Sequence, residues 1–329
     1  MRRFALRAVV VLLLAALAVA GGSAYWVWHR FNAPGPLTAE KTLIVPKGVG
    51  VRAVAHELRG AGVIDNETVF VLGARYLRLG RHLRAGEFAF APRMTMRAVV
   101  RHLVSGAMVL RRLTIPEGLL SAEVVKLVDN ADGLTGAVDK VPPDGTLLPE
   151  TYFYSYGDSR ESMVRRMQSA MDTALSEAWK GRAEGLAIRS PQEALVLASI
   201  IERETAVPAE RPRISAVFNN RLKRGMRLQS DPTVAYAITG GKHALDRPLT
   251  TADLKLDSPY NTYERDGLPP GPIANPGRAS LAAAVHPADT KDLYFVADGT
   301  GGHAFSTTLR EHNRNVARWR KLEREQKSR

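Results

Sequence analysis

The chain of 329 residues contains no cysteine. This absence excludes disulfide bonds, thiolate nucleophiles and cysteine-ligated metal centres together. It assigns no compartment, because a secreted bacterial protein can also do without cysteine. A glycine-rich phosphate loop and the G-x-S-x-G motif of serine hydrolases are missing as well. Neither nucleotide binding nor Ser-His-Asp hydrolysis is therefore indicated.

Close metal-ligand spacing is also missing. His286, His303 and His312 lie far from one another along the chain, and none has a second ligand at the short spacing typical of zinc sites. Each is more typical of a structural histidine. We expect no metal and no cofactor.

Acidic residues are fewer than basic ones, 33 against 46, which gives a formal net charge of +13. The basic residues are spread along the whole chain and form no compact basic-aromatic module, so nucleic-acid binding is not indicated. An anionic surface or polymer of the cell envelope accounts for the charge equally well.

Charge is absent altogether from Ala8 to Trp28. As a helix this stretch is about 31 Å long, which matches one hydrocarbon core. Arg2, Arg3 and Arg7 precede it, so the positive-inside rule predicts residues 1–7 in the cytoplasm and all later domains outside it. We expect a single-pass protein of the cell inner membrane whose later domains are periplasmic.

A cleavable signal peptide is the alternative for this segment, because Ala18-Val19-Ala20 matches a small-residue cleavage pattern. The apolar character continues beyond it into Tyr25, Trp26 and Trp28, which would form an aromatic belt at the far interface. This continuation favours a retained anchor over residues 8–28.

Beyond the anchor, the patterns predict an α+β protein with a linker at 29–41, a small α/β subdomain at 42–108 and a larger mixed α/β domain at 109–325. In the subdomain we expect strands at 42–46 and 86–90 and helices at 51–58, 67–79 and 94–103. In the larger domain we expect a strand at 109–115 and helices at 190–205, 214–223 and 316–326, with loops dominating from Gly225 onward.

The segment 193–222 carries two acids, Glu202 and Glu204, at the end of a strongly apolar helical run. A carboxyl group on a buried helix is costly unless it is paired or protonated, so each is a candidate general acid. Residues two apart point about 200° away from each other and cannot serve one site side by side. Periodicity does not choose between them. Alternatively, one or both form ion pairs with Arg203, Arg211 or Arg213.

Three later loops combine amides, hydroxyls, carboxylates and aromatic rings: Gln229–Thr233, Pro259–Tyr263 and the stiff turn Gly267–Ile273. Aromatic faces and amides suit sugar rings, which stack on one side and need donors and acceptors on their hydroxyls. Ordinary loops often have the same composition, so each segment alone is weak evidence.

Seven segments in the same order closely resemble the YceG-like family of endolytic murein transglycosylases. They are LASIIERET (197–205), FNNRL (218–222), GMRLQSDPTVAYA (225–237), SPYNTY (258–263), GLPPGPIANPG (267–277), AAVHPA (283–288) and LYFVADGTGGHAFSTTLREHN (293–313). The resemblance covers nearly the whole chain after the linker. It implies that 42–108 is a LysM-like subdomain, a type associated with glycan binding, and that 109–325 is the catalytic domain.

The resemblance further implies Glu202 as the catalytic acid, because it is the first glutamate of the family's E-[KR]-E-T segment. Glu202 would protonate the leaving oxygen between N-acetylmuramic acid and N-acetylglucosamine in nascent strands, then deprotonate the muramoyl 6-hydroxyl. The product is a 1,6-anhydro end, which makes the enzyme a lyase that terminates glycan strands. Five residues of the matching motifs are candidates for substrate contact or for orienting Glu202: Gln229, Asp231, Tyr236, Asn261 and Tyr263. Alternatively, the same residues hold their loops in place, and for Asp231, beside Pro232, the two roles are equally expected.

The expected partners are peptidoglycan glycan strands, the membrane and peptidoglycan synthases. Two other functions stay open. One is a two-carboxylate hydrolase in which Asp231 joins Glu202. The other is a non-enzymatic glycan-binding scaffold of cell-wall synthesis.

Overall fold

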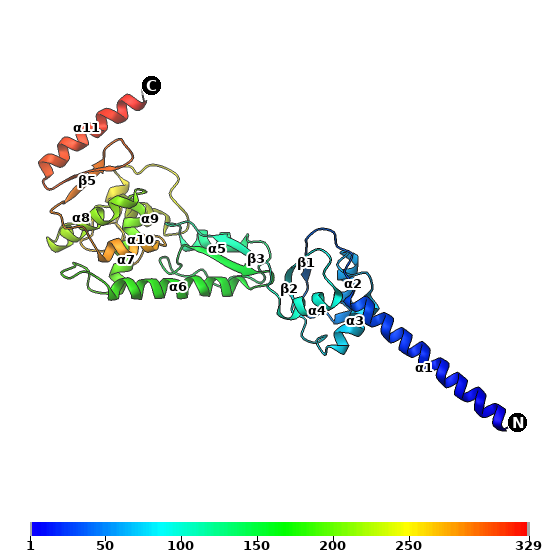
Figure 1. Ribbon diagram of the computed structural model, residues 1–329. Helices are drawn as coiled ribbons and strands as arrows, with labels where there is room; N and C mark the ends of the chain where they lie inside the picture. The colour runs from blue at the N-terminus through cyan, green and yellow to red at the C-terminus, as the bar shows by residue number, and fades with distance from the viewer. Residues whose placement is uncertain (1, 328–329) are drawn as a thin grey trace. The chain divides into compact units, whose positions relative to one another are not determined.

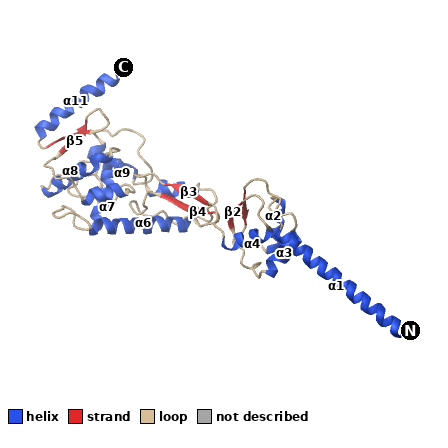
Figure 2. Ribbon diagram, in the orientation of Figure 1, coloured by secondary structure: helices blue, strands red, loops and turns tan. Residues whose placement is uncertain are grey.

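The computed structural model describes residues 2–327 and divides into two compact units (Figure 1). The first unit comprises the chain up to Arg111 together with Phe153–Gly157, and the second comprises Arg112–Tyr152 and the chain from Asp158 onward. Both units contain helices and short strands (Figure 2). The mixed α and β class expected from the sequence is confirmed.

The first unit packs three helices against one small sheet. Its elements are α1 (Arg2–Asn32), β1 (Lys41–Val45), α2 (Val51–Gly60), α3 (Glu67–Tyr76), β2 (Gly86–Phe90) and α4 (Met96–Ser105). β1 and β2 pair antiparallel with Leu43 opposite Phe88. Asn66 and Thr95 cap α3 and α4 through their side-chain oxygens. The strands and helices expected between 42 and 103 are confirmed to within a few residues.

Helix α1 contains a stretch, Leu6–Asn32, that is long and apolar enough to cross a membrane. The helix extends past Trp28, where the sequence patterns end the anchor, and takes in the first residues of the expected linker. Its last turns fold with the first unit, because Phe31 is buried against Gly73 of α3. A Cβ atom on residue 73 would lie 2.1 Å from the Phe31 ring.

The second unit consists mainly of helices around α7. β3 (Leu110–Thr114) and β4 (Thr151–Ser155) pair as a two-stranded sheet. The other elements are α5 (Ser121–Asp129), α6 (Arg160–Lys180), α7 (Pro191–Glu204), α8 (Arg211–Lys223), α9 (Asp231–Thr239), α10 (Arg278–Val285), β5 (Tyr294–Ala297), β6 (His303–Ser306) and α11 (Leu309–Lys327).

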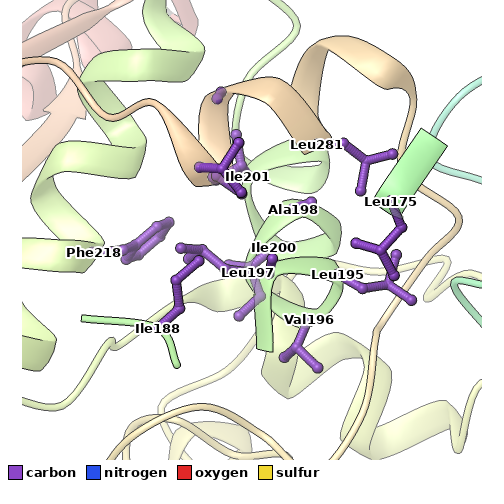
Figure 3. Close-up of a cluster of buried hydrophobic side chains, with 14 of the residues drawn as sticks. Leu175, Ile188, Leu195, Val196, Leu197, Ala198, Ile200, Ile201, Phe218 and Leu281 are labelled. Atoms are coloured by element: carbon purple, nitrogen blue, oxygen red, sulfur yellow. The ribbon is translucent and has the colours of Figure 1, made fainter. Parts of the chain in front are cut away.

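Helix α7 is the centre of the largest hydrophobic core (Figure 3). Ser190 caps it by accepting a hydrogen bond from the Glu193 amide, and Pro191 occupies the first turn. Every residue from Ala194 to Ile201 is buried, so neighbours surround the helix on all sides. Each large apolar side chain buried here contributes about 1.5–3 kcal/mol. The core thereby fixes the orientation of the two acids that follow it.

The expectation that loops dominate after Gly225 is wrong for three stretches. Helix α9 begins directly at Asp231, with Pro232 in its first turn and Gly240 in left-handed conformation at its end. Helix α10 follows the Pro-rich turn, and the β5–β6 hairpin precedes a terminal helix that begins earlier than expected, at Leu309. The span Pro259–Pro276 contains no helix or strand, as expected.

Candidate functional site

The two acids at the end of α7 have different surroundings, as the helical geometry requires. Glu202 lies in the last turn, Glu204 is the final helical residue, and Thr205 leaves the helix in extended conformation. Each carboxyl group therefore contacts a distinct set of residues.

Glu202 is held in an ion pair. Its Oε1 accepts a hydrogen bond of 3.0 Å from Nη2 of Arg211, and its Oε2 accepts one of 2.9 Å from the Gly277 amide at the start of α10. The side chain is 4% exposed. Arg211 also contacts Glu117 at 3.2 Å. The pairing of an α7 acid with Arg211, one alternative drawn from the sequence, is confirmed for Glu202.

Glu204 has a neutral partner instead. The Ser230 hydroxyl donates a hydrogen bond of 2.5 Å to its Oε1. The pKa of Glu204 is raised to about 7. Burial of the carboxyl group is the main cause and the nearby Asp231 also raises the pKa, whereas the Ser230 hydrogen bond and the charge of Arg221 lower it. A carboxyl group with this pKa exchanges its proton near neutral pH, as a general acid and base must.

A pocket of about 580 Å³ opens beside Glu204. Three of the residues expected from the sequence to contact substrate, Gln229, Asp231 and Tyr263, line it with Glu204. The other wall comes from the C-terminal part of the chain and includes Phe295, His303, His312, Trp319 and Arg320. Arg221 of α8 also lines the pocket. Glu202 is not among the lining residues.

The pocket residues hold one another in place. The Tyr263 hydroxyl donates a hydrogen bond of 2.6 Å to Oδ1 of Asp231, and burial together with this acceptor raises the Tyr263 pKa. Arg221 donates from Nη1 to the Gln229 side-chain oxygen at 3.2 Å. Gln229 has a positive φ of 52°, which its backbone bond to Thr262 helps to maintain.

Tyr236 and Asn261 lie outside this pocket. Tyr236 donates a 2.8 Å hydrogen bond to Asp144 and packs on the ring of Tyr260 beside a separate, smaller cavity. Asn261 is fully buried, and its amide bonds the carbonyls of Leu254 and Leu256 and the Tyr263 amide. These contacts give Asn261 the role of holding the loop that presents Tyr263.

His303 lines the pocket, although its spacing in the sequence is more typical of a structural histidine than of a metal ligand. Its Nδ1 lies 2.7 Å from Glu210, whose other oxygen accepts a hydrogen bond from the His303 amide. Phe295 packs edge-on against the imidazole, with ring centroids 5.3 Å apart. Among the described residues, no group of three or more His, Asp and Glu side chains is arranged to hold a metal ion. The sequence signal that could have indicated a role for His303 in the site is its position in the Gly-Gly-His segment (301–303) of the longest family motif.

Comparisons with known proteins agree with the resemblance. The model of the YceG-like family matches residues 43–318. An endolytic murein transglycosylase of Bacillus subtilis is 35% identical over 306 residues, covering 82% of each chain. One of Streptococcus pneumoniae is 29% identical over 323 residues, which are 84% of this chain but 58% of that protein. A crystal structure of a YceG-like protein from Listeria monocytogenes aligns with a TM-score of 0.53 at 30% identity, covering 84% of this chain and 98% of that one.

Proposed function

This chain belongs to the YceG-like family, and from that premise we propose that it is a membrane-anchored endolytic murein transglycosylase. Its substrate is then the peptidoglycan glycan strand, and its activity is that of a lyase. The curated relatives with this name align with more than four fifths of the chain. The family model covers the residues that line the pocket beside Glu204 up to Val316.

The proposed reaction breaks the bond between N-acetylmuramic acid and N-acetylglucosamine. A protonated carboxyl group gives its proton to the leaving glycosidic oxygen. The resulting carboxylate takes the proton of the muramoyl 6-hydroxyl, whose oxygen bonds to the anomeric carbon. One 1,6-anhydro end and one free 4-hydroxyl result, no water is consumed, and the acid recovers its proton. A single carboxyl group with a pKa near neutrality suffices.

We assign this acid to Glu204, where the sequence resemblance points to Glu202. The observation that carries the assignment is the contrast between their partners: Glu202 is paired with Arg211, whereas Glu204 is hydrogen-bonded to a hydroxyl and lines the pocket with a pKa of about 7. Burial stabilises the protonated form of the Glu204 carboxyl group, which is the form that a general acid needs.

Sugar contacts are assigned to the other pocket residues. Trp319 offers an apolar face for a pyranose ring, and Gln229 and Tyr263 offer donors and acceptors for hydroxyl and acetamido groups. His303, held by Glu210, adds a ring nitrogen of fixed orientation. Asp231, which accepts the Tyr263 hydroxyl bond, orients that side chain and raises the pKa of Glu204.

The cellular setting follows the anchor. We place α1 across the inner membrane with residues 1–7 in the cytoplasm and both units on the periplasmic side, where nascent glycan strands and their synthases are found. Residues 42–108 would act as a LysM-like subdomain that binds glycan or positions the catalytic domain at 109–325.

A two-carboxylate hydrolase is the second candidate, since Asp231 and Glu204 line one pocket and Asp231 acts on the Glu204 pKa. Digestion of purified glycan strands separates the two. Mass analysis of the new ends is expected to show 1,6-anhydro-muramic acid, and reducing ends without the anhydro product would overturn the lyase assignment. The same strands are treated in parallel with the Glu204→Gln and Glu202→Gln proteins. We expect only Glu204→Gln to lose the ability to cleave them.

A further inference from the structure

A second large pocket lies in the first unit, between the end of the anchor helix and α3. Its volume is about 550 Å³, and its lining is mostly apolar. Helix α1 contributes the side between Ser23 and Phe31, and α3 contributes Leu72, Gly73 and Tyr76. We call this feature the anchor groove.

The anchor groove is rigidly built. Phe31 is 3% exposed and fills the space that a side chain at Gly73 would need. Arg30 forms an ion pair of 2.7 Å with Asp65. The last turns of α1 and the helix α3 therefore move as one body, and the position of the anchor in a membrane fixes the depth of α3.

That depth follows from helix geometry. If Trp28 marks the far membrane interface, Ser23 lies about 7–8 Å deeper, at 1.5 Å per residue. Ser23 and Leu72 line the same groove. Leu72 is 44% exposed and Tyr76 is 76% exposed, which is a poor arrangement in water but a favourable one at the boundary of headgroups and acyl chains.

Arg97 of α4 supplies a positive charge to the groove. Its Nε is buried and has no hydrogen-bond partner among the described residues, although its guanidinium lies 6.0 Å from the Phe31 ring centre. A buried donor without an acceptor is costly, and a phosphate oxygen would satisfy it. Around it, the span from His29 to Arg111 contains thirteen Arg and Lys residues against five Asp and Glu residues.

We propose that the anchor groove binds an anionic phospholipid of the periplasmic leaflet, with one acyl chain along Val27, Leu72 and Tyr76 and the phosphate at Arg97. The apolar lining, the unpaired donor and the excess of positive charge match the two parts of that molecule. The groove is continuous with the membrane span, which argues for lipid as its occupant. The consequence is a first unit held at a fixed height and tilt on the membrane.

This inference rests on the proposed membrane anchor and is independent of glycan cleavage. Because the chain has no cysteine, single cysteines carry a nitroxide label without background. The full chain is reconstituted in vesicles of phosphatidylcholine and phosphatidylglycerol with a label at Leu13→Cys, Tyr76→Cys or Glu57→Cys. Collisions with dissolved oxygen and with a water-soluble nickel complex then report depth.

We expect the labels at positions 13 and 76 to collide mainly with oxygen. The label at position 57, which is exposed on α2, should collide mainly with the nickel complex. If Leu13 favours nickel, the anchor itself is wrong. If Leu13 favours oxygen while Tyr76 behaves like Glu57, the anchor stands and the groove proposal is overturned.

Arg97 is tested by native mass spectrometry of the full chain released from the same vesicles. Arg97→Gln is expected to retain about fivefold fewer phosphatidylglycerol molecules, since one Arg–lipid contact is worth roughly 1 kcal/mol. Arg101→Gln, which removes an exposed charge one turn along α4, is the matched control and is expected to retain the parent number. Equal loss from both variants would show diffuse attraction and overturn the site.

Discussion

The Ser230 hydroxyl donates a hydrogen bond of 2.5 Å to Oε1 of Glu204 and so links the start of α9 to the end of α7. This contact supplies a neutral donor to a carboxyl group that lies in the pocket wall. The other acid of α7, Glu202, instead accepts a hydrogen bond from the guanidinium of Arg211. Two acids that are two residues apart thus differ in the partners that the fold gives them.

Replacement of Glu204 tests the assignment of the acid. Glu204→Gln keeps the shape and can still accept the Ser230 bond, but it has no proton to transfer. We expect cleavage of glycan strands to fall by about 10²–10⁴-fold, the range for removal of a general acid. Release of 1,6-anhydro products per unit time measures it, with circular dichroism as the control for folding. Cleavage at the parent rate by the folded variant would refute the assignment.

Glu202→Gln is expected to act on stability. The amide can accept the Gly277 hydrogen bond but loses the charge that balances Arg211, which then depends on the more exposed Glu117. We expect a loss of about 1–3 kcal/mol in the free energy of unfolding. Denaturant titration measures that loss, and cleavage per folded molecule should stay within an order of magnitude of the parent. A loss of cleavage without a loss of stability would return the catalytic role to Glu202.

The pKa of about 7 at Glu204 predicts two pH effects. Cleavage needs the protonated acid and should decline as the pH rises through 7. The free energy of unfolding should also decline over a related pH range, because the pKa of Glu204 in the folded protein lies above the ordinary glutamate value of 4.5. The stabilisation that Glu204 contributes is complete below the pKa of its carboxyl group in the unfolded chain. It is lost as the pH rises through the pKa of that group in the folded protein.

The size of the stability effect is at most roughly 3 kcal/mol, at 1.36 kcal/mol per pKa unit. Glu204→Gln does not ionise, so it should gain stability relative to the parent as the pH rises from about 5 to about 8.5. Denaturant titrations of both proteins at the two pH values measure the gain. If the difference in the free energy of unfolding between the two proteins is the same at both pH values, the pKa of Glu204 is not raised.

Asn261→Ala should loosen the loop that presents Tyr263. The substitution removes hydrogen bonds to the carbonyls of Leu254 and Leu256 and to the Tyr263 amide, all in a buried setting. Each unsatisfied group costs about 1–3 kcal/mol. We expect a clearly lower melting temperature and weaker cleavage with the anhydro product unchanged. A direct sugar contact by Asn261 would instead reduce cleavage at an unchanged melting temperature.

Much of the framework could be predicted from local signals. Ser190, Pro191 and Glu193 mark the start of α7, and the apolar run to Ile201 predicts its burial. In contrast, Asp231-Pro232 suggests a rigid loop, although the same pair also suits a first helical turn, and the structure has α9 there. The short α10 is rich in alanine, whose small side chains give little periodicity.

The candidate site could be predicted only in part, for a physical reason. Helical geometry places Glu202 and Glu204 on different sides, but the state of each depends on partners elsewhere in the chain. Arg211 and Gly277 approach Glu202, and Ser230 approaches Glu204. Such long-range contacts leave no trace in the periodicity of α7. The wall formed by Trp319 is likewise brought in by the tertiary fold.

Gly73→Ala tests whether the anchor helix is built into the first unit. The added Cβ would lie 2.1 Å from the Phe31 ring, so the ring, α3 or the end of α1 has to shift. Overpacking of this kind costs about 1–3 kcal/mol. Gly60→Ala is the matched control: Gly60 also lies in a helix, and its added Cβ would have no neighbour within 4 Å. Thermal unfolding of the full chain in detergent should show a lower midpoint for the first variant and an equal or higher one for the second. Equal midpoints for both variants would mean that Phe31 does not pack on α3 in solution.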